Sequence, residues 1–195
     1  MGPFPHDAPQ SKITLKNPAG TDVFVVVEFT DKKPDMLRGS FSCMGFAMTA
    51  RHRSKAIDLW QQDDITFGLN AEPDGFVARF GAQYGPCAPA MRWQLVSAQK
   101  AFDHVVSRGA EPYMKADRSF NMPAIKGIGG SLLYFVQYDG ISDPFASEFK
   151  RASKDLLKGV GFYYPDDLPH NVSKGNMTDG PSFIKSCLTS VIFLN

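Results

Sequence analysis

Three side chains that could bind a metal ion stand close together in the C-terminal part of the sequence: Asp166, Asp167 and His170. Carboxylate oxygens and imidazole nitrogens are common ligands of divalent metals in proteins. In a strand, Asp167 and His170 would point to opposite faces, and Pro169 between them prevents a regular helix. The residues that follow contain no His or Glu and a single Asp, Asp179. We therefore expect this trio to chelate a metal poorly on its own.

Other motifs are better explained by structure than by chemistry. The glycine-rich stretch 126–133, KGIGGSLL, has Leu132 where a dinucleotide-binding loop needs its third glycine, and it lacks the Gly-Lys-Ser/Thr end of a P-loop. The cationic run 51–55, RHRSK, is typical of a solvated strand end, with a carboxylate or phosphate clamp as the alternative. Cys43 and Cys87 have no His nearby in the sequence to activate a thiolate.

Composition limits the classes of function. The 195 residues are 43% hydrophobic and 21% charged, and their formal net charge is +1, so we expect neither a nucleic-acid partner nor binding to an anionic membrane. No apolar run approaches the roughly 20 residues of a membrane span, and the first residues lack the pattern of a secretion signal. The three cysteines form no CxxC pair. These features predict a cytoplasmic protein.

Apolar spacing predicts that one βαβββ unit occurs twice. In the first unit, a strand at 23–30 leads into a helix that Gly45 ends, and three strands follow. In the second unit, a strand leads into a helix that Ser97 can cap and Gly109 ends, and further strands follow. A short strand and a glycine turn are expected within 121–130. The remaining expected elements are strands at 47–53, 56–62, 65–70, 90–96, 111–117 and 130–138 and a short helix at 74–85.

This order of elements predicts an α+β fold in which paired βαβββ modules form a barrel around a shared cavity. The modules are expected at about 21–72 and 87–140. Residues 1–20 are expected to form a leader, and residues 141–195 a linker followed by strand fragments.

Six blocks of sequence occur in the order found in a known family: NPAGTDVFVVVEF, MGFAMTARHRSK, LNAEPDGFVARF, YGPCAPAMRW, AQKAFDHVVSRGAEP and MPAIKGIGGSLLY. From Asn17 to about Gly140 they resemble the N-terminal half of 4-hydroxyphenylpyruvate dioxygenase, of the vicinal oxygen chelate (glyoxalase-like) superfamily, and a weaker match resumes at DLPHNV. The resemblance implies two barrel-like halves, each of two βαβββ modules. It also implies that the C-terminal half binds Fe(II) through two His and one Glu, whereas the N-terminal half holds no metal and mainly supports assembly.

The resemblance also assigns positions to the metal candidates. Asp167 stands where the family has its first iron-binding His, and His170 matches a neighbouring His that is not a ligand. The second His and the Glu of the family have no counterpart in this sequence, so we expect no complete triad and no metal or cofactor in this chain. Glu28, on the first predicted strand, is a further weak candidate for a metal ligand.

Within the two modules, the positions that resemble the metal ligands are Val26, Ala90 and Tyr134. Two of these have no donor atom, and a protonated Tyr is a poor Fe(II) ligand. We expect instead a cavity between two sheets, lined by Phe24, Met91, Trp93 and Tyr134.

Three functions remain open, of which the first is favoured. The chain is a non-catalytic domain, acting in assembly or in small-molecule binding, whether a free-standing relative or the product of a truncated gene. Alternatively, it is a component of an active Fe(II)-dependent 4-hydroxyphenylpyruvate dioxygenase, or a diverged metal-dependent enzyme. A third possibility is a small-molecule sequestering protein, whose dimeric aromatic cleft would contain Trp60 and Trp93.

The expected partners are a second copy of the chain, forming a homodimer, a separate catalytic chain and a small aromatic ligand. The apolar run Val191–Leu194 would otherwise be an exposed strand edge. We expect it to pack on its own barrel or on a neighbouring subunit.

Overall fold

The computed structural model describes residues 12–15, 17–137, 145–152 and 159–162, and for residues 22–24 the backbone alone. Its strands are β1 (Thr21–Thr30), β2 (Ala47–His52), β3 (Ile57–Gln62), β4 (Ile65–Asn70), β5 (Cys87–Leu95), β6 (Ala124–Lys126), β7 (Leu132–Gln137) and β8 (Phe149–Arg151). Its helices are α1 (Pro34–Cys43), α2 (Phe76–Tyr84), α3 (Ala98–Ser107) and the short 3-10 helix η1 (Ile128–Gly130). Asp167 and His170 lie outside the described residues, as do the sequence from 163 onward and its expected edge strand.

The first module, from β1 to β4, is the βαβββ unit that the sequence predicts. β1 is rich in β-branched residues, which favour strands. α1 begins with Pro34, whose fixed φ suits the first turn of a helix. After α1, Gly45 has a φ of 83°, a left-handed conformation that glycine adopts without strain, and the chain turns back into β2. A two-residue turn at Asp63 and Asp64 joins β3 to β4.

The second module repeats this order with one strand fewer. Ser97 directly precedes α3, but its side chain makes no capping hydrogen bond. The predicted strand at 111–117 is wrong beyond its start, because it is reduced to one bridge between Pro112 and Ile125. Around this bridge the Tyr113 N–H donates to the Ala124 carbonyl at 2.8 Å and the Lys126 N–H to the Glu111 carbonyl at 2.9 Å. Beyond it the chain turns, and Tyr113 Oη donates to Asp117 at 2.7 Å, four residues on. The short strand and glycine turn expected within 121–130 are present as β6 and η1.

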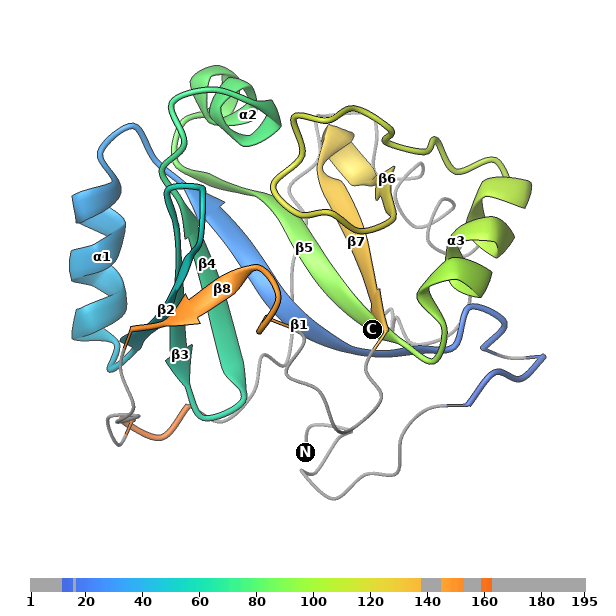
Figure 1. Ribbon diagram of the computed structural model, residues 1–195, viewed down its shortest axis with the longest axis horizontal. Helices are drawn as coiled ribbons and strands as arrows, with labels where there is room; N and C mark the ends of the chain where they lie inside the picture. Colours follow the sequence, from blue (N-terminus) through green and yellow to red (C-terminus); the bar gives the residue numbers. More distant parts are fainter. Residues whose placement is uncertain (1–11, 16, 138–144, 153–158, 163–195) are drawn as a thin grey trace.

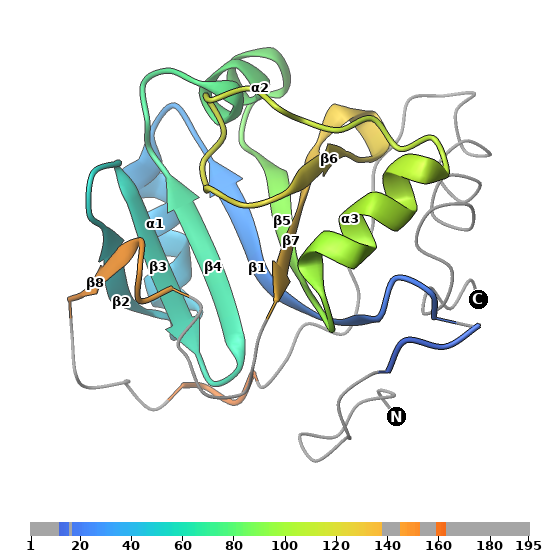
Figure 2. The same ribbon diagram turned by 45° about the vertical axis from the view of Figure 1, so that its right-hand side comes forward.

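All eight described strands belong to one mixed sheet, in the order β6-β7-β5-β1-β4-β3-β2-β8. β1 and β5 pair antiparallel and join the modules, while β4 runs parallel to β1 and β7 parallel to β5. The edge strands β6 and β8 do not pair with each other, so the sheet is open. The α+β fold of paired modules is therefore confirmed, although its barrel does not close. In Figures 1 and 2, α1 and α3 lie on the outside of opposite halves of the sheet.

Apolar clusters occupy both faces of the sheet. Trp60 belongs to the cluster that packs against α1, and Trp93 belongs to the one that packs against α3. None of the described helices is long and apolar enough to cross a membrane. The opposite face of the sheet, which we call the inner face, carries a third cluster that combines residues of both modules. This cluster contains Ala50, Ile57, Leu59, Ala90, Tyr113, Phe120, Ala124, Leu132, Tyr134 and Phe149.

Candidate functional site

A carboxyl group (Glu28), a guanidinium (Arg92) and a phenol (Tyr134) are buried together on the inner face. Strand register places Arg92 of β5 opposite Val26 of β1 and opposite Tyr134 of β7. Glu28 lies two residues beyond Val26 on β1, and since side chains alternate along a strand, it shares the same face. Glu28 and Arg92 are each 1% exposed and Tyr134 is fully buried. Charged groups are seldom buried so completely unless they are paired, which makes this cluster the candidate site.

Glu28 is held by a side chain from the end of β4. The Asn70 amide donates to Glu28 Oε1 at 2.7 Å and to Ser119 Oγ at 3.1 Å. The Ser119 N–H in turn donates to Tyr134 Oη at 3.0 Å. Glu28 Oε2 has no hydrogen-bond partner among the described residues. The cluster therefore joins β1, β4 and β7 through a loop that neither module's strand pattern predicts.

Lys55 fixes that loop. Its Nζ donates to the carbonyl oxygens of Arg118 and Ser119, at 2.9 Å and 2.7 Å. Three donors on one ammonium group allow it to bind two carbonyls at once. Lys55 thus connects the turn between β2 and β3 with the loop that carries Ser119.

Burial governs the electrostatics of the cluster. It raises the pKa of Glu28, although hydrogen bonds from Ser119 and Asn70 and the charge of Arg92 act in the opposite direction. Burial lowers the pKa of Arg92 to about 10 and raises the pKa of Tyr134, with the charge of Glu28 adding to the increase. Burial therefore opposes the ionised form of Glu28, while Arg92 keeps its charge at neutral pH.

Arg92 connects the centre of the sheet with its far edge. Its guanidinium lies over the ring of Phe120, 3.3 Å from the centroid, an arrangement that favours a cation. Arg92 Nη2 donates to Glu148 Oε2 at 3.4 Å, and Glu148 Oε1 accepts the Asn121 N–H at 3.0 Å. Glu148 directly precedes β8, which pairs with β2. Arg92 therefore ties the segment that carries β8 to the inner face, and Figures 1 and 2 show β8 at the edge of the sheet beside β2.

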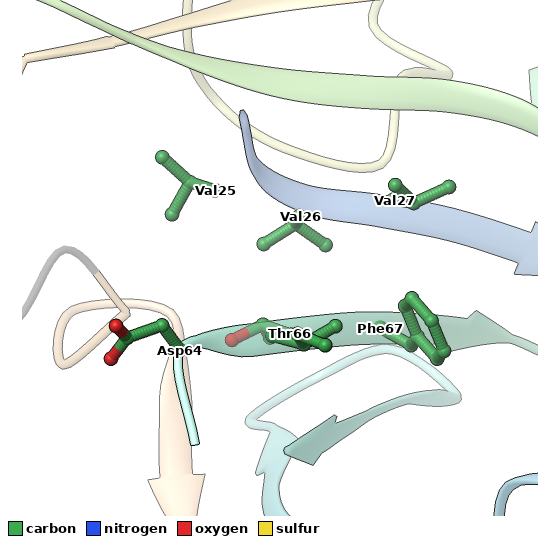
Figure 3. Close-up of a pocket in the computed structure, with 7 residues that line it drawn as sticks. Val25, Val26, Val27, Asp64, Thr66 and Phe67 are labelled. Carbon is green, nitrogen blue, oxygen red and sulfur yellow. The ribbon is translucent and has the colours of Figure 1, made fainter. Parts of the chain in front are cut away.

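Two hollows in the described structure differ in the volume that they offer to a ligand. The pocket between β1 and β4, lined by Val25, Val26, Val27, Asp64, Ile65, Thr66 and Phe67, has a volume of about 10 Å³ (Figure 3). That volume holds about one water molecule at most, so this pocket is no ligand site. A wider hollow of about 260 Å³ lies where α2 begins, and Asn70 and Ser119 form part of its wall. Charged residues of both signs surround it: Lys55, Glu72, Asp74, Asp117 and Arg118.

The described residues of the inner face do not offer the ligands of an Fe(II) centre. A facial triad requires two His and a carboxylate with open coordination positions. Of the three positions that resemble ligands, Val26 and Ala90 have no donor, and the raised pKa of Tyr134 keeps its phenol protonated. Glu28 has the Arg92 cation as a neighbour, which opposes a second cation there. No cluster of three His, Cys, Asp or Glu side chains able to hold a metal occurs in the part of the chain that the structure describes.

The structure separates most of the residues expected to line the cavity. Tyr134 lies on the inner face, whereas Met91 and Trp93 belong to the cluster against α3. The backbone of Phe24 pairs with that of Trp93, and its side chain is outside the described part. Trp60 and Trp93 pack against two different helices, α1 and α3, so they do not form one cleft within a single chain.

The cationic run 51–55 is used within the chain. Arg51 Nε donates to Asp58 Oδ1 at 2.7 Å, His52 Nδ1 accepts the N–H groups of Ser54 and Lys55, and Lys55 binds the loop described above. The run is therefore a strand end and turn whose cations have partners in the protein itself.

Sequence reasoning missed Arg92, Asn70, Ser119 and Glu148. Of these, Arg92 could have been found from the sequence. It is a lone arginine inside the apolar strand 90–95, and a buried arginine needs partners for its charge. Asn70 ends β4, and Ser119 and Glu148 lie outside the helices and strands, so none of the three carries such a signal.

Comparison with known proteins identifies the family. Residues 15–150 match the family described as hydroxyphenylpyruvate dioxygenase, HPPD, N-terminal. The chain belongs to this family. It is 41% identical over 177 residues to a 4-hydroxyphenylpyruvate dioxygenase of Pseudomonas aeruginosa, covering 86% of this chain and 49% of that protein. It is 39% identical over 176 residues to hemolysin VllY of Vibrio vulnificus, with coverage of 86% and 49%. The chain thus spans about half the length of these relatives of the HPPD family.

Solved structures agree with the HPPD fold. A fusion of a xylose isomerase-like TIM barrel with 4-hydroxyphenylpyruvate dioxygenase superposes with a TM-score of 0.74 at 26% identity, covering 92% of this chain and 28% of the fusion. A mutant of 4-hydroxymandelate synthase from Streptomyces coelicolor gives a TM-score of 0.61 at 15% identity, with coverage of 85% and 51%. The second likeness concerns the fold alone.

Proposed function

We propose that this domain is the non-catalytic N-terminal half of a 4-hydroxyphenylpyruvate dioxygenase-type protein of tyrosine catabolism, and that it supports assembly. The chemistry of the inner face carries the proposal. Where the family resemblance places metal ligands in a module, this chain has Val26, Ala90 and Tyr134, and the neighbouring carboxylate of Glu28 is bound by Asn70 and faces the charge of Arg92.

Packing supports the same role. Phe120, Phe149 and the guanidinium of Arg92 fill the space between the two halves of the sheet. A reaction centre of this family would need room for an aromatic substrate, O₂ and a metal on that face. In this arrangement the inner face leaves no room for those three groups, which favours a role in assembly over a role in catalysis.

Iron and oxygen measurements test this proposal. The purified chain is reconstituted anaerobically with Fe(II), freed of excess metal, and supplied with 4-hydroxyphenylpyruvate in an oxygen electrode. We expect no stoichiometric iron and no oxygen uptake. One iron per chain together with turnover would overturn the proposal, because it would require ligands that the inner face does not provide.

Sequence identity favours a second candidate, in which this chain is a component of an active Fe(II)-dependent dioxygenase. Its relative at 41% identity is named 4-hydroxyphenylpyruvate dioxygenase. A separately produced C-terminal half of that Pseudomonas relative would then bind this chain. Oxygen uptake that appears only when the two polypeptides are mixed would establish this candidate, and separate elution on size exclusion would count against it.

Assembly itself is measurable. We propose that the chain forms a homodimer, and light scattering coupled to size exclusion should give twice the monomer mass of 21.5 kDa. A monomer at all accessible concentrations would contradict an assembly role through self-association.

A further inference from the structure

The guanidinium of Arg92 is buried but only partly hydrogen-bonded. Its Nη2 reaches Glu148 at 3.4 Å, a long distance for a charge-assisted bond. Its Nε and Nη1 have no partner among the described residues. Buried N–H groups are nearly always paired in native proteins, so an exception requires an explanation.

Among the described residues, the carboxylate that pairs with Arg92 comes from a segment at the edge of the sheet. Glu148 belongs to residues 145–152, whose strand β8 has three residues and pairs with β2 alone in the described sheet. The side chain of Glu148 is 19% exposed, whereas that of Arg92 is 1% exposed. Of this ion pair, Glu148 is therefore the member that solvent reaches.

Flat apolar groups surround the same cation. The ring of Phe120 lies 3.3 Å from the guanidinium carbon, and the rings of Phe145 and Phe149 lie 5.2 Å and 5.9 Å from it. Phe145 and Phe149 belong to the same segment as Glu148. This segment thus presents one carboxylate and two aromatic rings to Arg92, in the manner of a bound ligand.

We propose that Arg92 anchors a binding site for a small carboxylate with a flat apolar body, and that the chain's own segment 145–151 closes this site by placing Glu148 on the anchor. A ligand takes the place of Glu148, binds the fork of Arg92 through both carboxylate oxygens and lies against Phe120. Arginine suits this task, because its planar fork matches a carboxylate. The proposal goes beyond the assembly role and does not depend on it.

Charge selects a carboxylate over other anions. Glu28 lies close enough to Arg92 for each to influence the charge of the other. A phosphate or sulfate would bring about two negative charges into this buried region, where one arginine is available. A monoanion that replaces Glu148 leaves the local charge unchanged, and its apolar body replaces the rings that leave with the segment.

Benzoate is the probe, with benzamide as its neutral counterpart of the same shape. Binding is measured by calorimetry on the full chain, on Glu148→Gln and on Glu111→Gln. Glu111 is a matched control, because its carboxylate is 65% exposed and pairs with Lys126 on the surface. If the closed form makes up about nine tenths of the molecules, its removal raises apparent affinity about ten-fold.

We expect Glu148→Gln to bind benzoate about ten-fold more tightly than the unaltered chain, Glu111→Gln to match the unaltered chain, and benzamide to bind none of them. Adding Arg92→Met to Glu148→Gln should abolish benzoate binding while the circular dichroism spectrum stays unchanged. Equal affinity of Glu148→Gln and the unaltered chain, or equal binding of benzamide and benzoate, would overturn the proposal.

Hydrogen exchange supplies a test that needs no substitution. The Phe149 N–H donates to the Phe145 carbonyl at 2.8 Å inside the closing segment. Saturating benzoate should accelerate exchange in peptides that cover 145–151 and leave those of β1 unaffected. Unchanged or slower exchange at 145–151 would mean that the segment does not open for a carboxylate, and the proposal would be wrong.

Discussion

The side-chain amide of Asn70, at the end of β4, donates a 2.7 Å hydrogen bond to the carboxylate of Glu28 in β1. The same amide donates to Ser119 Oγ at 3.1 Å. Both of its N–H groups are therefore used, and its carbonyl oxygen accepts the N–H of Glu72 at 2.9 Å. One buried amide thus satisfies groups from a strand and two loops.

Asn70→Ala should lower the free energy of unfolding by about 3 kcal/mol, because it leaves the buried Glu28 carboxylate without this donor and removes the contact to Ser119. Urea unfolding followed by circular dichroism measures the change. Asn121→Ala is the control: the Asn121 side chain is exposed, accepts from Arg118 at 3.3 Å, and should change stability by no more than about 0.5 kcal/mol. Equal effects of the two substitutions would show that the Asn70 network contributes little.

Glu28 should make the stability of the protein depend on pH in an unusual direction. Burial raises its pKa above the ordinary value of 4.5, so the folded protein binds a proton more tightly than the unfolded chain. Stability from this group is full below pH 4.5 and declines as the pH rises toward the folded-state pKa. Most paired carboxylates behave in the opposite way.

Glu28→Gln should therefore stabilise the protein relative to the unaltered chain above pH 4.5, with the difference growing as the pH rises and then levelling off. Urea unfolding between pH 4 and pH 8 gives the profile, and the exposed Glu111→Gln serves as control. A difference between Glu28→Gln and the unaltered chain that stays constant with pH would indicate that the pKa of Glu28 is not raised in the folded state.

The first module could be predicted from sequence because its signals are local. Gly45 and the pair Asp63 and Asp64 mark turns between runs of strand residues, and each signal acts within a few neighbours. The strand at 111–117 is over-predicted, because backbone pairing with β6 stops after Tyr113, and where it stops depends on tertiary contacts that the local pattern does not show.

The site could not be predicted in the same way. Nearly every residue from Pro89 to Leu95 is buried, so apolar alternation does not tell which of Met91 and Arg92 faces α3 and which faces the inner side. Glu28 and Asn70 are 42 residues apart in the sequence. Arg92 and Glu148 are 56 apart. Such pairs arise from sheet register, which a single sequence does not display.

Gly81 in α2 and Gly39 in α1 should respond oppositely to alanine. Replacing a helical glycine by alanine normally stabilises by about 0.5 to 1 kcal/mol. A Cβ at Gly81 would lie 2.8 Å from Thr30 Cγ2, whereas a Cβ at Gly39 would meet nothing within 4 Å. We expect Gly39→Ala to stabilise by about 0.5 kcal/mol and Gly81→Ala to destabilise by about 1 to 2 kcal/mol. Thermal unfolding of both variants checks the contrast, and stabilisation by both would show that α2 can move away from β1.

Cys43 should react with iodoacetamide faster than Cys87. Cys43 is exposed and Cys87 is half-buried at the start of β5. Burial raises the pKa of the Cys87 thiol, and the charge of Asp31 raises it further, so a smaller fraction is thiolate, the reactive form. Peptide mass spectrometry at pH 8 with increasing reaction time should show the Cys43 peptide labelled first. In denaturant both burial and the fixed position of Asp31 are lost, and the two rates should approach each other. Faster labelling of Cys87 in the folded protein would mean that β5 opens at this end.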